Sequence, residues 1–118
     1  MDTPYKYNQY ITLVNEQHDI TPALIAQIKK DFGSYLNTEP DLSINPSIYT
    51  SLYLWVFPAV EHLFKNDRQK FTALIYSIDA GFIKDKFGKR TETELQQWVH
   101  AILLRECLKV FIRNNYKV

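Results

Sequence analysis

Apolar residues recur at helical spacing along much of the chain, and this spacing is the first indication of its fold. The clearest stretch follows Thr21 and Pro22, a pair that is typical of a helix start because threonine caps and proline fits the first turn. The apolar positions after it are separated by one, three or four residues: Leu24, Ile25, Ile28, Phe32, Tyr35 and Leu36. We predict a helix with Thr21 as its cap, which Gly33 weakens or ends.

Two further helices are predicted in the middle of the chain. Asn66 or Asp67 can cap the first, and its apolar residues form a narrow stripe: Phe71, Leu74, Ile75 and Ile78. A shorter helix is expected from Ala80 to Phe87, where Gly88 would stop it.

The longest predicted helix occupies the carboxyl-terminal part of the chain. Thr91 and Glu94 match the spacing of a capping box, and the sequence from Leu95 to Tyr116 contains neither glycine nor proline. Apolar residues cover nearly all sides of its middle: Trp98, Val99, Ile102, Leu103, Leu104, Leu108, Val110, Phe111 and Ile112. Since no single face can hold them all, this helix should lie at the centre of the fold.

Two segments fit either a helix or a strand. Tyr7 to Val14 and Ile48 to Phe57 have helix-compatible spacing, but both are rich in aromatic and β-branched residues that favour strands. Asn45 and Pro46 could start a helix from Ser47 to Phe57, with Pro58 kinking it or opening a new turn. We therefore predict one all-α domain over residues 1–118, a compact bundle of five or six helices around the carboxyl-terminal helix. The alternative is an α+β fold with a short N-terminal hairpin.

Composition and charge narrow the classes of function. The 118 residues include 14 Lys and Arg against 13 Asp and Glu, a net charge of +1 that gives no overall attraction to nucleic acid or anionic membranes. The charge-free stretch from Leu42 to Val60 is interrupted by polar residues and two prolines, so we expect no membrane segment. A lone Cys107 and the absence of a signal-peptide pattern favour a cytoplasmic protein.

Candidate chemistry is sparse, so we favour a non-enzyme without metal or cofactor. Cys107 has apolar neighbours that favour an inert thiol, and His18, His62 and His100 lack metal-ligand spacing. With three glycines, the chain has no phosphate-binding loop. An enzyme or small-ligand carrier would need a site assembled from distant residues, for which folding could bring together these carboxyl groups: Glu61, Asp79 and Glu106.

A basic row is predicted near the carboxyl end. Its members are four residues apart and share one strip of a helix: Arg105, Lys109, Arg113 and Lys117. The positive side chains of such a strip could bind successive phosphates of a nucleic-acid backbone. One hypothesis is therefore a weak nucleic-acid binder. We favour a solvated strip at a helix carboxyl end, because cations are stabilised there and Glu106 dilutes the charge.

Aromatic residues give the preferred hypothesis of function. If the segment around them is a helix, Tyr49, Tyr53 and Phe57 share one face, while Leu52, Trp55 and Val56 cover another. We favour a core helix packed against the carboxyl-terminal helix as the structural role of this segment. One small core does not easily bury both faces, however, and Tyr and Trp are enriched at protein interfaces. We therefore predict a non-catalytic interaction or regulatory domain that uses Tyr49, Tyr53 and Phe57 to contact a protein partner or a second copy of the chain.

Overall fold

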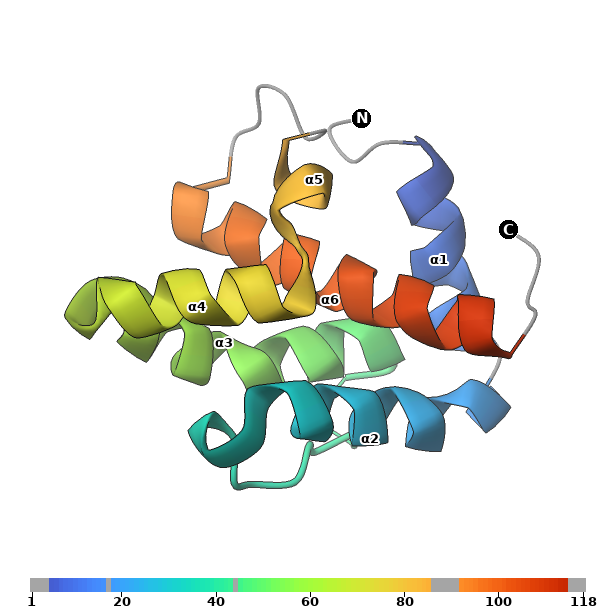
Figure 1. Cartoon of the computed structure of the whole chain (residues 1–118). Helices are drawn as coiled ribbons and strands as arrows, with labels where there is room; N and C mark the ends of the chain where they lie inside the picture. Colours follow the sequence, from blue (N-terminus) through green and yellow to red (C-terminus); the bar gives the residue numbers. More distant parts are fainter. Residues whose placement is uncertain (1–4, 17, 44, 86–91, 115–118) are drawn as a thin grey trace.

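The protein is an all-α bundle, as predicted. The computed structural model describes residues 5–16, 18–43, 45–85 and 92–114. Within these ranges lie six α-helices and no strand: α1 (Tyr5–Glu16), α2 (Thr21–Phe32), α3 (Ile48–Asn66), α4 (Arg68–Ile78), α5 (Gly81–Lys84) and α6 (Glu94–Arg113) (Figure 1). Two short 3-10 helices, η1 (His18–Ile20) and η2 (Gly33–Tyr35), flank α2.

Both ambiguous segments are helical, so the alternative with an N-terminal hairpin is wrong. Residues 7–14 belong to α1 and residues 48–57 to α3. Tyr10 and Val14 are buried at an i, i+4 spacing in α1, as are Leu52 and Val56 in α3. Burial at this spacing requires a helix, and the packing outweighs the strand preference of the aromatic and β-branched residues.

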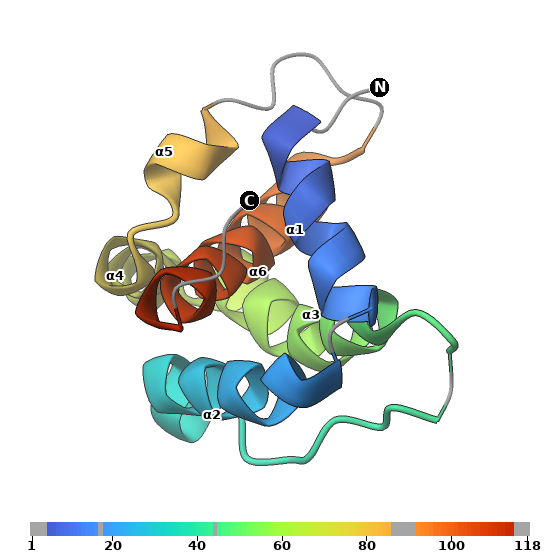
Figure 2. The same cartoon turned by 90° about the vertical axis from the view of Figure 1, so that its right-hand side faces the viewer.

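The helix α6 lies at the centre of the bundle, which confirms the predicted central position of the carboxyl-terminal helix. The other five helices surround it in two perpendicular views, and each of them contacts it (Figures 1 and 2). Half of its residues are buried: Leu95, Val99, Ala101, Ile102, Leu103, Leu104, Glu106, Cys107, Val110 and Phe111. They belong to one hydrophobic core to which all six helices contribute.

The start of α3 is capped both locally and by another helix. Ser47 is its N-cap and accepts a hydrogen bond from the Thr50 backbone N–H. The side-chain oxygen of Asn15, near the end of α1, accepts from the Tyr49 N–H at 2.9 Å and from the Ser47 hydroxyl at 3.2 Å. From there α3 continues through Pro58 as far as Asn66, so the predicted end at Phe57 is wrong.

Two predicted helix starts are wrong. The N-cap of α2 is Ile20 rather than Thr21, because η1 runs directly into α2 and the chain at Ile20 is already in a helical conformation. The capping box of α6 uses Thr93 and Gln96 instead of the predicted pair two residues earlier. The sequence contains two overlapping matches to this motif, and the second one is used; Thr91 lies outside the described residues.

The remaining boundaries agree more closely with the sequence. Asp67 caps α4 by accepting from the Lys70 N–H, and α2 ends at Gly33, whose positive φ of 55° suits glycine. The helix α5 is shorter than predicted, and Gly88 is outside the described residues. No helix in the described parts of the chain is long and apolar enough to cross a membrane.

Candidate functional site

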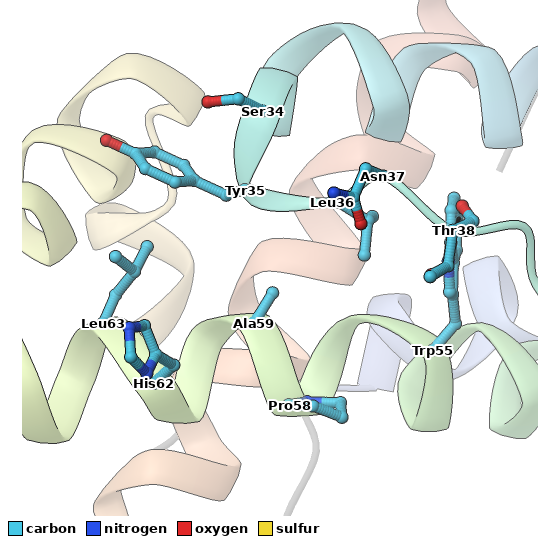
Figure 3. Close-up of a pocket in the computed structure, with 10 residues that line it drawn as sticks. All are labelled: Ser34, Tyr35, Leu36, Asn37, Thr38, Trp55, Pro58, Ala59, His62 and Leu63. Carbon is cyan, nitrogen blue, oxygen red and sulfur yellow. Dashed lines mark hydrogen bonds between the residues drawn. The ribbon is translucent and has the colours of Figure 1, made fainter.

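Two hollows meet along one flank of α3. The larger, about 510 Å³, lies between α3 and residues 34–38 (Figure 3). Its α3 side has the spacing of a continuous helical strip: Trp55, Pro58, Ala59, His62 and Leu63. The smaller, about 260 Å³, shares Thr38 and Trp55 with the first and extends to Asp41 and Leu54. We call the two together the α3 trough.

The wall opposite α3 follows from the way in which α2 ends. Gly33 stops α2 in a conformation that other residues rarely adopt, and η2 then turns the chain alongside α3. Leu36 is buried in the core, and the indole Nε1–H of Trp55 reaches the carbonyl oxygen and the hydroxyl of Thr38, each at 3.2 Å. These contacts hold the wall against α3, and the contact between Trp55 and Thr38 bridges the trough where the two hollows adjoin.

The trough has an apolar floor and an uncharged polar rim. Figure 3 shows Ala59 pointing from α3 toward the wall, with Tyr35 opposite Leu63 at one end and Thr38 beside Trp55 at the other. The side chains of Ser34, Tyr35 and Asn37 lie on the rim. None of these three forms a hydrogen bond with any other side chain or backbone group in the described ranges, so their polar groups are available to a ligand.

The far end of the trough is acidic. Glu39 and Asp41 line it, together with the half-exposed side chain of Leu54. Glu39 is paired with Lys29, whereas Asp41 accepts hydrogen bonds from the hydroxyl and the backbone N–H of Ser43. These two bonds lower the pKa of Asp41, and no cation of the described chain pairs with its carboxylate.

The predicted partner residues lie together, but on the flank of α3 that faces α6. Tyr49 is only 5% exposed, and its hydroxyl is 2.9 Å from Nδ1 of His100. Tyr53 and Phe57 are half-buried, with ring centroids 5.7 Å apart. Because Tyr49 has so little exposed surface, a partner would have to contact mainly the other two side chains. Their role in binding stays a prediction.

This flank also contains a small pocket of about 250 Å³. Its lining is polar and aromatic: Tyr49, Thr50, Tyr53, Glu92, Gln96 and His100. The ring of Tyr53 lies 4.6 Å from that of His100. Burial, reinforced by the charge of Glu92, raises the pKa of Tyr53, so its hydroxyl stays protonated near neutral pH. The pocket is smaller than the roughly 300–1,000 Å³ of most small-molecule sites.

The described members of the basic row contact other parts of the fold, and the side chains of Arg105 and Lys109 are only 20% and 21% exposed, so the preferred interpretation of a solvated strip is wrong for these two. Arg105 is 3.6 Å from the Asp79 carboxylate, and Lys109 donates to Asp31 at 2.8 Å. Arg113 donates to the side-chain oxygen of Gln27 at 2.8 Å. Lys117 lies outside the described residues, and nucleic-acid binding by this row stays a prediction. The ion pairs of Arg105 and Lys109 offset part of the charge that phosphates would need.

A buried carboxyl group lies between α6 and α2. Glu106 has no exposed surface, and neither of its carboxyl oxygens has a hydrogen-bond partner in the described part of the chain, although Lys109 Nζ is 3.4 Å from Oε1. Burial and the neighbouring Asp31 raise the pKa of Glu106 to about 9, with Lys109 offsetting only part of the shift. Burial alone would raise the pKa of Asp31, but the neighbouring Glu106 carboxyl group, together with hydrogen bonds from Lys109 and Gln27, holds it below its ordinary value.

The carboxyl groups named from the sequence do not form one site. Glu61 pairs with Lys65, Asp79 with Arg105, and Glu106 lies beside Asp31. Burial raises the pKa of the Cys107 thiol, which agrees with an inert cysteine. In the described ranges, no three side chains of the kinds that bind metals lie close enough together to hold an ion.

No known protein family, curated protein or solved structure matches this chain. The α3 trough therefore has to be interpreted from its own geometry. Sequence reasoning missed it, since residues 37–46 look like an ordinary connection. The available signal was the position of Tyr35 just beyond the helix-ending Gly33, outside the regular part of α2.

Proposed function

We propose that this protein is a non-catalytic interaction domain of the cytoplasm, which binds an extended peptide segment of a partner protein in the α3 trough. One observation carries the proposal: the rim of the trough has uncharged hydrogen-bonding side chains that the described fold does not use, above an apolar floor. The lone, buried thiol of Cys107 supports the cytoplasmic assignment, because cysteines stay reduced in the cytoplasm, whereas small secreted domains usually have paired cysteines in disulfides.

The length of the trough fits a peptide. From Ser51 to Leu63 the α3 side extends about 18 Å at the helical rise of about 1.5 Å per residue. An extended chain advances about 3.3 Å per residue, so five or six residues would fill this length. Small-molecule sites usually enclose about 70–90% of the ligand surface, whereas a long trough covers a chain from one side.

The chemistry of the rim fits a peptide backbone. An extended segment has unpaired N–H and C=O groups at every residue. The side-chain amide of Asn37 can donate and accept hydrogen bonds at the same time, and the hydroxyls of Ser34 and Tyr35 can either donate or accept one. Within α3, Pro58 has no N–H to donate to the Leu54 carbonyl, which leaves another acceptor beside the smaller hollow.

Filling the trough should abolish peptide binding. We expect Ala59→Phe to place a ring where the peptide would lie and to weaken binding at least tenfold, since Ala59 points into the trough. A phage-displayed library of random seven-residue peptides would supply the ligands, and fluorescence anisotropy would measure their affinity for both proteins. Ala73→Phe makes the same change at an exposed position of α4 and should leave binding intact.

Two results would contradict the proposal. Either no peptide is selected above background, or the selected peptides bind Ala59→Phe as tightly as the unchanged protein. Sedimentation velocity on both variants would reveal the competing occupant, a second copy of this chain. A dimer that dissociates only in Ala59→Phe would replace the peptide as the occupant of the trough.

A further inference from the structure

We propose that the α3 trough selects segments in which a lysine or arginine lies three or four residues from an apolar anchor. This inference rests on the proposed peptide-binding function and adds the kind of segment that is bound. It follows from the difference between the two ends of the trough, one apolar and uncharged, the other acidic.

The apolar end suits a side chain such as leucine. Tyr35 of the wall and Leu63 of α3 face each other there, and the side chain of Ala59 points from α3 toward the wall (Figure 3). The small alanine side chain leaves room that a larger residue would fill. An apolar anchor placed there would remove mainly the exposed surface of Tyr35 from water, since Leu63 is only 4% exposed, and each Å² buried gives about 25 cal/mol.

The acidic end suits a long cationic side chain. Two carboxylates, Glu39 and Asp41, line the smaller hollow, and no cation is among its lining residues. Lys29 neutralises only Glu39, so the local charge is close to −1. Leu54, which is 48% exposed, offers an apolar surface for the methylene stem of a lysine or arginine while the charged group reaches Asp41.

The distance between the ends sets the spacing of the motif. From Leu54 at the acidic end to Leu63 at the apolar end, the helix α3 rises about 13.5 Å, at about 1.5 Å per residue. An extended peptide covers this distance in three or four residues. The anchor and the cation should therefore be separated by that number of positions, on one defined side of the anchor, because the two ends of the trough differ.

A lysine scan would test the motif. The probes are fifteen-residue peptides of serine and glycine with one central leucine and a single lysine moved through the other positions, titrated into ¹⁵N-labelled protein and followed by NMR chemical shifts. We expect the best lysine position to be three or four residues from leucine and to bind about two- to fivefold tighter than its glutamine counterpart, as for an exposed ion pair. The advantage should shrink as salt is raised.

Variants of the protein separate this inference from the function on which it rests. In Glu39→Gln/Asp41→Asn the lysine advantage should disappear while the glutamine peptide still binds. The control Glu16→Gln/Glu94→Gln removes two exposed carboxylates elsewhere and should retain it. If lysine position makes no difference but Ala59→Phe still blocks binding, the motif is wrong and the peptide-binding function stands. If no peptide shifts the resonances of the trough, both are wrong.

Discussion

The contact between α6 and α2 changes the protonation of individual side chains. Glu106 has no exposed surface there, and it is surrounded by one acid, Asp31, and one base, Lys109. A charged carboxylate in such a place costs several kcal/mol unless its oxygens are hydrogen-bonded. Keeping the proton avoids this cost, and the raised pKa of Glu106 expresses that preference.

The buried acid predicts how stability depends on pH. The pKa of Glu106 rises from about 4.5 to about 9 on folding, so between these values the unfolded chain loses a proton that the folded protein keeps. Its contribution to the free energy of unfolding is therefore greatest below about pH 4.5 and falls as pH rises to about 9. Urea unfolding at several pH values should show that Glu106→Gln removes a slope of up to about 1.4 kcal/mol per pH unit.

The control for Glu106→Gln is the same substitution at a glutamate whose side chain is exposed to water. Glu94→Gln, at an exposed position of the same helix, should keep the fall in stability that Glu106 produces as pH rises toward about 9. Parallel profiles for Glu106→Gln and the unchanged protein would contradict the buried, protonated acid. Below about pH 4 Asp31 acts in the opposite sense, since its lowered pKa makes stability fall as it becomes protonated.

Sequence reasoning named Glu106 but placed it wrongly, on a solvated strip, whereas its side chain has no exposed surface. A glutamate within the apolar middle of a predicted central helix is recognisable as unusual. Asp31 is not, because it stands among polar residues of α2 and only the packing of α2 against α6 brings it to Glu106 and Lys109. For the same reason, the basic row could be placed on one strip of a helix, while its acceptors on other helices could not be predicted.

Individual helices depend on contacts at their ends as well as on their apolar faces. The start of α3 illustrates this, because Asn15 of α1 accepts two hydrogen bonds there. These bonds satisfy a backbone N–H that the helix itself leaves unpaired, and they tie the end of α1 to α3. The sequence shows Asn15 only as a polar residue near the end of an ambiguous segment.

Removing this cap should destabilise the protein. We expect Asn15→Ala to lower the free energy of unfolding by about 1–2 kcal/mol, since the Tyr49 N–H loses its acceptor. Asn37→Ala removes the same group from an exposed side chain that forms no hydrogen bond within the described chain, and it should change stability by less than about 0.5 kcal/mol. Equal effects of the two substitutions in urea unfolding would exclude a capping role.

Helix boundaries were predictable where a single local signal existed. Asp67 and Gly33 fix the start of α4 and the end of α2 through their own side chain and backbone. The start of α2 was mispredicted because η1 extends the helical conformation upstream of Thr21. The strand-forming residues of α3 were ambiguous because only a neighbouring surface decides whether an aromatic segment packs at a period of two or of 3.6.

At the scale of the whole molecule, one core connects all six helices through α6. The all-round apolar pattern of α6 made this arrangement predictable. The α3 trough was not, because its wall and floor are far apart in the sequence and meet only when α2 ends beside α3. A surface that forms between elements leaves no periodic pattern in either of them.

Truncating the centre of the core should affect the entire fold. We expect Ile102→Ala to lower the free energy of unfolding by about 2–5 kcal/mol, because it opens a cavity where α6 is fully buried. Ile112→Ala makes the same change in the same helix at a side chain that is 63% exposed, and it should cost less than about 0.5 kcal/mol. Circular dichroism and tryptophan fluorescence should report one coincident transition in each protein; separate transitions would contradict a single cooperative domain.

The position of α6 also determines when the protein can fold during its synthesis. This helix follows the others in the chain, yet each of them packs against it. At about 5–20 residues per second, the ribosome makes Leu24 of α2 roughly 4–17 s before Val110 of α6. Throughout that interval the apolar faces of the earlier helices have no central helix to cover them. The nascent chain must therefore wait, exposed to chaperones and to aggregation, until almost all of α6 has left the ribosome.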